Sequence, residues 1–154
     1  NEPNRDLAAE ELVKLAYPTG NNDLPVTVGY HYSNTNYALL PLLIEKVSGF
    51  SYAEFLKKEI FDPLNMKHTY VYDMQHASVA TPSFNWDGSF WSLDEFDLTY
   101  GDKNIYSTPR DLLKWDQALN AGRVLNTALL DSAYTPLSNE RPSVHNYGMG
   151  WRLV

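Results

Sequence analysis

The chain contains no cysteine, which excludes disulfide bonds, thiolate metal sites and a cysteine nucleophile. Basic residues are also scarce, with 12 Lys and Arg against 19 Asp and Glu, so the formal net charge is -7. Nucleic-acid-binding surfaces and polybasic membrane anchors need clustered Lys and Arg, and this balance argues against both. No apolar run approaches the roughly 18 residues of a membrane span, and no signal peptide is visible.

Histidine is the other common source of metal sites, and its spacing here does not suit one. No two histidines lie at i, i+4, and there is no His-Glu-x-x-His; the four are His31, His68, His76 and His145. We therefore predict no metal site and no cofactor. A Ser-His-Asp triad stays open on spacing alone, because the members of a triad come from distant positions.

The length and the apolar content set the scale of the fold. A chain of 154 residues with 44% hydrophobic content is long enough for one compact domain with a core. No internal repeat and no second complete domain is visible. We expect a single domain over residues 1–154, predominantly α-helical with minor short β segments.

Apolar periodicity and capping signals predict the helices. The expected segments are residues 5–16, 35–48, 51–60, 107–122 and, shorter, 126–134. Thr108 and Asn126 are the expected caps of the last two segments.

Three of these helices carry further signals. Ser33 or Asn34 is placed to cap the second segment, and Pro41 inside it predicts a kink or a local break. Ser51 and Glu54 form a capping-box pattern. In the segment 107–122, Asp111 stands where it can complete the cap, and an apolar stripe is expected from Leu112, Trp115 and Leu119.

Extended structure is expected in short pieces only. Residues 69–73 are β-branched and aromatic and predict a short strand, residues 24–30 a strand fragment or loop, and residues 147–154 the start of another strand. Residues 74–106 show no period but are rich in aromatic side chains. A stretch of this length without regular structure is usually functional or flexible.

Tyr32-Ser33-Asn34, ahead of an apolar helix, is the most informative tripeptide. A phenol and an amide at the mouth of a helix can lie side by side in a cleft. A free phenol has a pKa near 10, which nearby ammonium groups lower and burial raises. The plainer interpretation is a core tyrosine followed by a helix cap. Ser33 lacks a Gly-x-Ser-x-Gly elbow and an adjacent base, so we expect it to cap the helix rather than to act as a nucleophile.

Several longer segments follow this tripeptide in order: Ile44 to Leu56, Ile60 to Lys67, Ile105 to Trp115, and Tyr147-Gly-Met-Gly-Trp151. Together with Tyr30 to Leu40 they resemble the serine β-lactamase-like family, which includes class C β-lactamases, penicillin-binding D-Ala-D-Ala carboxypeptidases and related esterases. The resemblance covers most of the chain, from about Leu24 to Trp151.

The resemblance implies a serine acyl hydrolase that works through an acyl-enzyme. Tyr32 matches the tyrosine that exchanges protons with the nucleophilic serine, and Asn34 matches the asparagine that positions substrate and a lysine. The implied partner is a small acyl substrate (a β-lactam, a D-Ala peptide or an ester), and the implied location is the bacterial periplasm or the exterior.

The chain departs from the family pattern in two segments, because it contains neither Ser-x-x-Lys nor Lys-Thr-Gly. We therefore expect an excised helical subdomain of the family's α+β fold, inactive by itself, from an active parent enzyme. The alternative is a non-catalytic binding or sensor module on the same scaffold. Asn65 and Asn104 stand where glycine is commoner, which predicts left-handed backbone at both.

Overall fold

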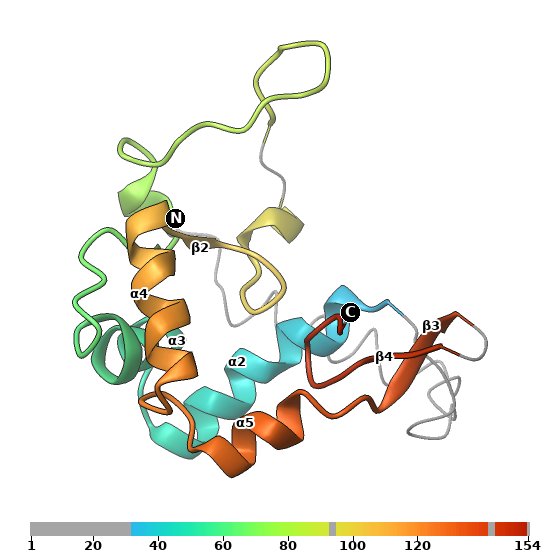
Figure 1. Ribbon diagram of the computed structural model, residues 1–154. Coiled ribbons are helices and arrows are strands. Elements are labelled where there is room, and N and C mark those ends of the chain that lie inside the picture. Colours follow the sequence, from blue (N-terminus) through green and yellow to red (C-terminus); the bar gives the residue numbers. More distant parts are fainter. Residues whose placement is uncertain (1–31, 93–94, 142–143, 154) are drawn as a thin grey trace.

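The computed structural model describes residues 32–92, 95–141 and 144–153 (Figure 1). Helices predominate in this part of the chain, and its strands are two to four residues long. This composition confirms the expected helix-rich fold with short β segments. The helix expected over residues 5–16 and the extended piece over 24–30 lie outside the described residues.

Helix α2, Asn34–Ser48, lies beside α3 and carries the tripeptide at its start (Figure 1). Ser33 caps it by accepting a hydrogen bond from the Asn36 N–H at 3.3 Å, and Gly49 ends it with φ of 74°. The helix continues unbroken through Pro41, so a local break does not occur. Burial of Pro41 in tertiary contacts outweighs its poor helix propensity here.

Helix α3, Tyr52–Leu56, continues directly into a π-helical turn, η1, Lys57–Phe61. Ser51 and Glu54 form the predicted capping box, in which each side chain bonds the backbone N–H of the other residue. The turn that follows contains Asn65 with φ of 56°, which confirms the expected left-handed position.

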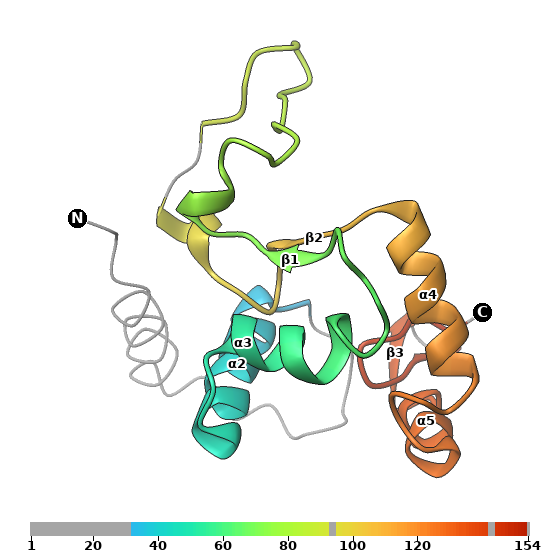
Figure 2. The same cartoon turned by 90° about the vertical axis from the view of Figure 1, so that its left-hand side faces the viewer.

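Strand β1, Tyr70–Val71, pairs antiparallel with strand β2, Ile105–Tyr106 (Figure 2). The first strand confirms the extended segment expected over 69–73. The second lies in the stretch for which sequence showed no regular structure. That stretch also contains two 3₁₀ turns, η2, Met74–His76, and η3, Glu95–Leu98.

Helix α4, Pro109–Asn120, begins with Thr108 as its cap and Pro109 in its first turn, as predicted. The expected apolar stripe is wrong in part, because Leu112 is 53% exposed. The buried side chains are instead Asp111, Ala118 and Leu119. The hydrogen bonds of the Asp111 carboxylate, rather than the spacing of the leucines, determine which face of α4 is buried.

Helix α5, Thr127–Ala133, is capped by Asn126 as expected. It leads into a hairpin of β3, Ser138–Arg141, and β4, Val144–Tyr147, which pair antiparallel with register irregularities. The strand expected to begin at Tyr147 therefore ends there. A turn follows in which Gly150 has φ of 80°, and Met149 donates its N–H to the Ala133 carbonyl at 2.9 Å.

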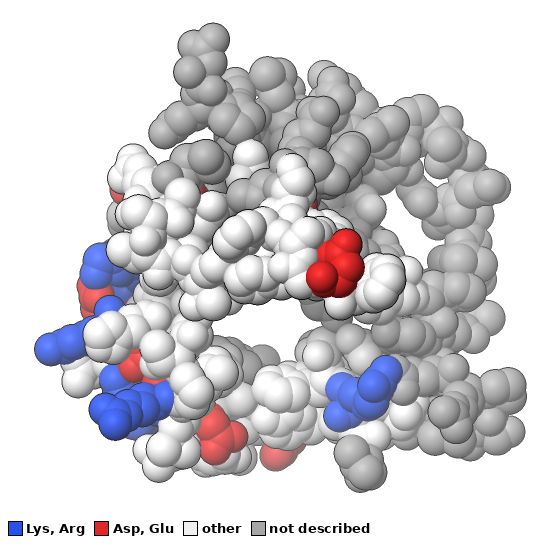
Figure 3. Space-filling model, turned by 90° about the horizontal axis from the view of Figure 1, so that it is seen from above, with Lys and Arg blue, Asp and Glu red and all other residues white. Residues whose placement is uncertain are grey.

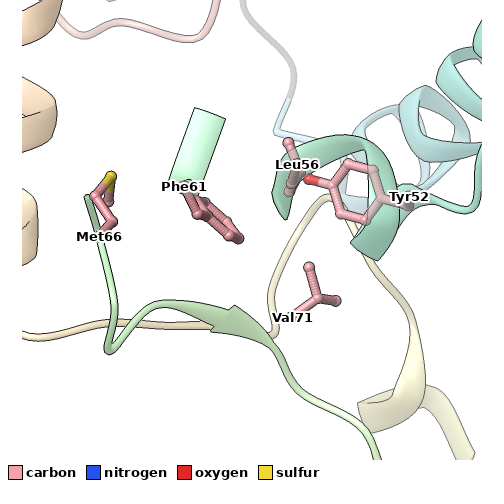
Figure 4. Close-up of a cluster of buried hydrophobic side chains, with 5 residues drawn as sticks. All are labelled: Tyr52, Leu56, Phe61, Met66 and Val71. Atoms are coloured by element: carbon pink, nitrogen blue, oxygen red, sulfur yellow. The ribbon is translucent and has the colours of Figure 1, made fainter. Parts of the chain in front are cut away.

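The hydrophobic core lies between α3, η1 and β1 (Figure 4). Its buried side chains are contributed by both helical turns and by the chain that returns to the strand: Tyr52, Leu56, Phe61, Met66 and Val71. Within the described residues, no helix combines the length and the apolar character required to cross a membrane.

Candidate active site

The tripeptide lines a small cavity at the N-terminal end of α2. The cavity measures about 200 Å³, and its walls come from three separate parts of the chain. The described lining residues are Tyr32, Ser33, Asn34, Tyr37, Gly101, Asp102, Tyr147 and Gly150. The structure thus brings the two predicted site residues, Tyr32 and Asn34, to one cavity.

The cap of α2 sets the direction of these side chains. Ser33 has extended backbone, with φ of -149° and ψ of 107°, and its hydroxyl accepts from the first turn of the helix. Its hydroxyl is therefore committed to the helix, as predicted. Tyr32 is 79% exposed and Asn34 is also exposed, so both are open to a ligand.

Two further phenols, those of Tyr37 and Tyr147, line the same cavity. The hydroxyls of Tyr37 and Tyr147 are 3.4 Å apart, within hydrogen-bond distance, and they join α2 to the end of β4. Sequence reasoning placed neither tyrosine in the site. The Tyr147-Gly-Met-Gly-Trp151 motif was a signal for one wall, but its contact with α2 spans 110 positions of sequence.

The third wall is the turn at Gly101 and Asp102. Gly101 has φ of 93°, and a Cβ built on it would lie 2.2 Å from the Tyr37 carbonyl oxygen and 2.7 Å from the Pro41 ring. Pro41 has no N–H to offer the helix, and its ring packs against the glycine backbone at this point. This fit holds Asp102 against the cavity, a residue that sequence reasoning missed.

The described aromatic side chains of residues 74–106 do not line this cavity. Tyr100 packs near Tyr52 and the core, and Tyr106 stacks on Tyr70. The others lie on a loop that projects from the body of the molecule, and Figure 3 shows that loop from above as a largely uncharged ridge. Phe84 packs on Phe90 with ring centroids 5.0 Å apart, and Trp86 is fully exposed. The part of this segment that lines the cavity is its last turn, at Gly101 and Asp102.

Two other polar clusters lie away from the cavity. The Asp73 carboxylate contacts the His76 ring at 2.7 Å, and the ring of Tyr70 stacks on that histidine. Burial raises the pKa of Tyr70 above its ordinary value. Among the described residues, no three His, Asp or Glu side chains converge in a way that would hold a metal ion.

The second cluster surrounds Asp111, whose side chain is fully buried. Its carboxylate accepts from the Lys114 ammonium at 2.6 Å, from the His68 backbone N–H at 2.7 Å and from the Thr69 hydroxyl at 3.1 Å. The Lys114 hydrogen bond holds the pKa of this carboxyl below its usual value. The cluster ties α4 to the start of β1, and its residues are not among those that line the cavity described above.

Comparison with known proteins decides the family. The family model described as Beta-lactamase matches residues 7–154, which is nearly the entire chain. The chain belongs to the beta-lactamase family. This confirms the resemblance drawn from the ordered motifs.

The chain is similar to beta-lactamase-family proteins that carry different names. Penicillin-binding protein 4* of Bacillus subtilis is 33% identical over 143 residues, which cover 81% of this chain and 31% of that protein. A teichoic acid D-alanine hydrolase of Staphylococcus aureus is 39% identical over 87 residues, covering 54% of this chain and 22% of the relative. This beta-lactamase-family chain therefore spans about a third or less of these relatives.

The solved structures agree on the fold of this beta-lactamase-family chain. The crystal structure of a penicillin-binding protein from Bacillus halodurans superposes with a TM-score of 0.68 at 22% identity. The match covers 92% of this chain and 45% of that one. At this identity the superposition supports the shared fold, with the described part forming a helical portion of it.

Proposed function

We propose that this chain forms the Tyr-x-Asn wall of a serine acyl hydrolase active site. Tyr32 exchanges the proton of a nucleophilic serine, and Asn34 orients the acyl substrate. The observation that carries the proposal is the shared cavity, in which an exposed phenol and a solvent-accessible amide stand together at the capped start of α2.

The chemistry follows from what each group can do. In acylation, Tyr32 acts as a phenolate and takes the proton from the serine hydroxyl as the serine oxygen bonds to the substrate carbonyl carbon. The same phenol then gives the proton to the leaving group as its bond to that carbon breaks. The amide of Asn34 offers both a donor and an acceptor, so it can bind a substrate amide or carbonyl in either direction.

The serine would come from a Ser-x-x-Lys, which the 154 residues do not contain. We therefore expect the isolated chain to leave a chromogenic β-lactam and an activated ester unhydrolysed. The names of the relatives, a penicillin-binding protein and a teichoic acid D-alanine hydrolase, support an acyl substrate of the β-lactam or D-alanyl class for the full-length protein.

The test is Tyr32→Phe in the full-length protein, assayed with the same two substrates. Loss of a proton-transfer group costs about 10²–10⁴-fold in rate, so we expect kcat/KM to fall at least about 100-fold. Tyr134→Phe is the matched control, because that ring packs edge-on against Trp151 outside the cavity. Near-normal turnover by Tyr32→Phe would refute the assignment, and absence of any covalent acyl-enzyme in the wild type would favour the binding-module alternative.

A further inference from the structure

The projecting loop, residues 77–92, exposes several large apolar side chains. Each is at least half exposed and Trp86 is fully exposed; they are Val79, Phe84, Trp86, Phe90 and Trp91. Figures 1 and 2 both show this loop extending from the body of the molecule, at the end opposite to α5. None of its residues lines the cavity at the start of α2. Exposed apolar groups gathered in this way mark an interaction surface.

The tip of the projecting loop is a tight turn that engages its own hydrogen-bond donors. The Asn85 N–H donates to the Ser89 carbonyl at 2.8 Å, and the Asn85 amide donates to the Ser89 hydroxyl at 2.9 Å and to the Phe90 carbonyl at 3.3 Å. Ser89 donates its own N–H and its hydroxyl to Asp87 Oδ1, at 2.9 Å and 2.7 Å. A turn that satisfies its donors internally loses little when it leaves water for a less polar medium.

The exposed rings lie on both faces of the projecting loop. Phe84 and Phe90 form an antiparallel bridge, with ring centroids 5.0 Å apart. Because successive side chains of an extended segment alternate between faces, Trp91 lies on the face opposite to Phe90, where its indole N–H donates to Asp97 at 3.0 Å. Trp86 stands at the turn between the two sides. A rigid partner would cover one face, whereas a fluid apolar medium surrounds a narrow loop on all sides.

The charge of the projecting loop matches a surface without net charge. Asp87 is the one ionisable side chain in residues 77–92 of the sequence, and no Lys or Arg occurs between His76 and Lys103. The hydrogen bonds from Ser89 hold the pKa of Asp87 below its usual value, so this carboxylate is ionised at neutral pH. A loop with one carboxylate and no cation is repelled by an anionic surface and is compatible with a zwitterionic one.

We propose that the projecting loop inserts shallowly into the interface of a zwitterionic lipid bilayer and holds the protein reversibly at the membrane surface. Trp is favoured at the level of the headgroups, because its ring is apolar and its N–H is polar. The ionised Asp87 limits the depth, since a charged group is costly in the bilayer interior. Such an attachment requires neither a spanning helix nor a polybasic anchor. The inference goes beyond the proposed function and does not depend on it.

The experiment measures how much full-length protein sediments with vesicles of phosphatidylcholine. We expect the wild type to bind, and Trp86→Ser to lower the partition coefficient at least about tenfold, because an aromatic ring removes roughly 150–250 Å² from water when it is buried. Leu129→Ser is the matched control, since this exposed side chain lies on α5 at the other end of the molecule, and it should bind as the wild type does. Asp87→Asn keeps an acceptor for Ser89 and removes the charge, so it should bind more tightly.

Absence of binding to these vesicles, or binding that Trp86→Ser leaves unchanged, would overturn the proposal. Tighter binding to vesicles that contain phosphatidylglycerol than to phosphatidylcholine alone would contradict the charge argument. Acrylamide quenching without lipid tests the other occupants, with the fluorescence of Trp86 taken as the difference between the wild type and Trp86→Ser. We expect that difference to be readily quenched. A protected Trp86 would mean that another part of the full-length chain, or a second copy, covers the loop, and the proposal would fall.

Discussion

Gly101→Ala should destabilise the protein more than any other single glycine-to-alanine change in the cavity region, because two costs coincide there. A side chain at φ of 93° is strained, at about 1–2 kcal/mol. The new methyl would also lie 2.2 Å from the Tyr37 carbonyl, and relieving such an overlap costs about 1–3 kcal/mol. We expect a total loss of roughly 2–5 kcal/mol in the free energy of unfolding.

Two other glycines allow the backbone strain and the steric overlap to be measured separately. Gly88 has φ of 84°, and a Cβ at this position would have no neighbouring atom within 4 Å, so Gly88→Ala carries strain alone. Gly148 has no left-handed φ, but a Cβ there would lie 2.2 Å from the Ala133 carbonyl, so Gly148→Ala carries overlap alone. The loss for Gly101→Ala should exceed that of either control variant.

The assay is thermal and urea unfolding of the full-length variants. Because the loss expected for Gly101→Ala is the larger one, its Tm and its urea midpoint should both fall further than those of Gly88→Ala. If Gly101→Ala loses no more stability than Gly88→Ala, then the close packing of this turn on α2 is wrong. In that case the wall of the cavity formed by Gly101 and Asp102 loses its support.

Two further predictions concern elements outside the cavity. Asp111→Asn should lower Tm strongly at pH 7, because the folded pKa of Asp111 lies below its ordinary value of 3.8 and the carboxylate therefore stabilises the fold above that pH. That contribution is lost as pH falls through the lower folded pKa, so the difference in Tm between the wild type and Asp111→Asn should become smaller below about pH 4. A Tm difference that stays constant down to about pH 2 would contradict an ionised Asp111 in this cluster. Ser51→Ala should cost about 1 kcal/mol by removing the cap of α3, with exposed Ser78→Ala as control, and equal urea midpoints for the two variants would speak against the capping box.

Local signals carried most of the helix prediction. The caps at Ser33, Ser51, Thr108 and Asn126 depend on contacts within a few residues, and sequence indicated all four. Capping geometry is set by the residue and its next turn, so it can be inferred without knowing the fold.

Contacts between distant residues account for what sequence did not show. β2 exists because it pairs with β1, and the register joins Tyr70 to Tyr106 across the whole aromatic loop. The buried face of α4 follows from the bond between Asp111 and the His68 backbone, which spans 43 positions. Neither pairing has a local pattern, so neither could be inferred from periodicity alone.

The candidate site also combines residues that a local signal indicated with residues that only contacts between distant segments bring in. Tyr32 and Asn34 were predicted from the resemblance to a family, which the tripeptide and the ordered segments after it carry. Asp102 and Tyr147 join them only through the fold, with the turn at Gly101 packing on α2 and the β4 hairpin reaching the Tyr37 hydroxyl. Sequence therefore indicated one wall of the cavity, and the structure supplied the other two.

The most direct test of the central claim is the time course of acyl-enzyme formation in the full-length protein, followed by intact mass after mixing with a β-lactam. The account predicts a covalent adduct on the serine of a Ser-x-x-Lys, formed at least about 100-fold more slowly by Tyr32→Phe than by wild type or Tyr134→Phe. Equal rates in Tyr32→Phe and wild type, or an adduct on a serine within these 154 residues, would contradict it.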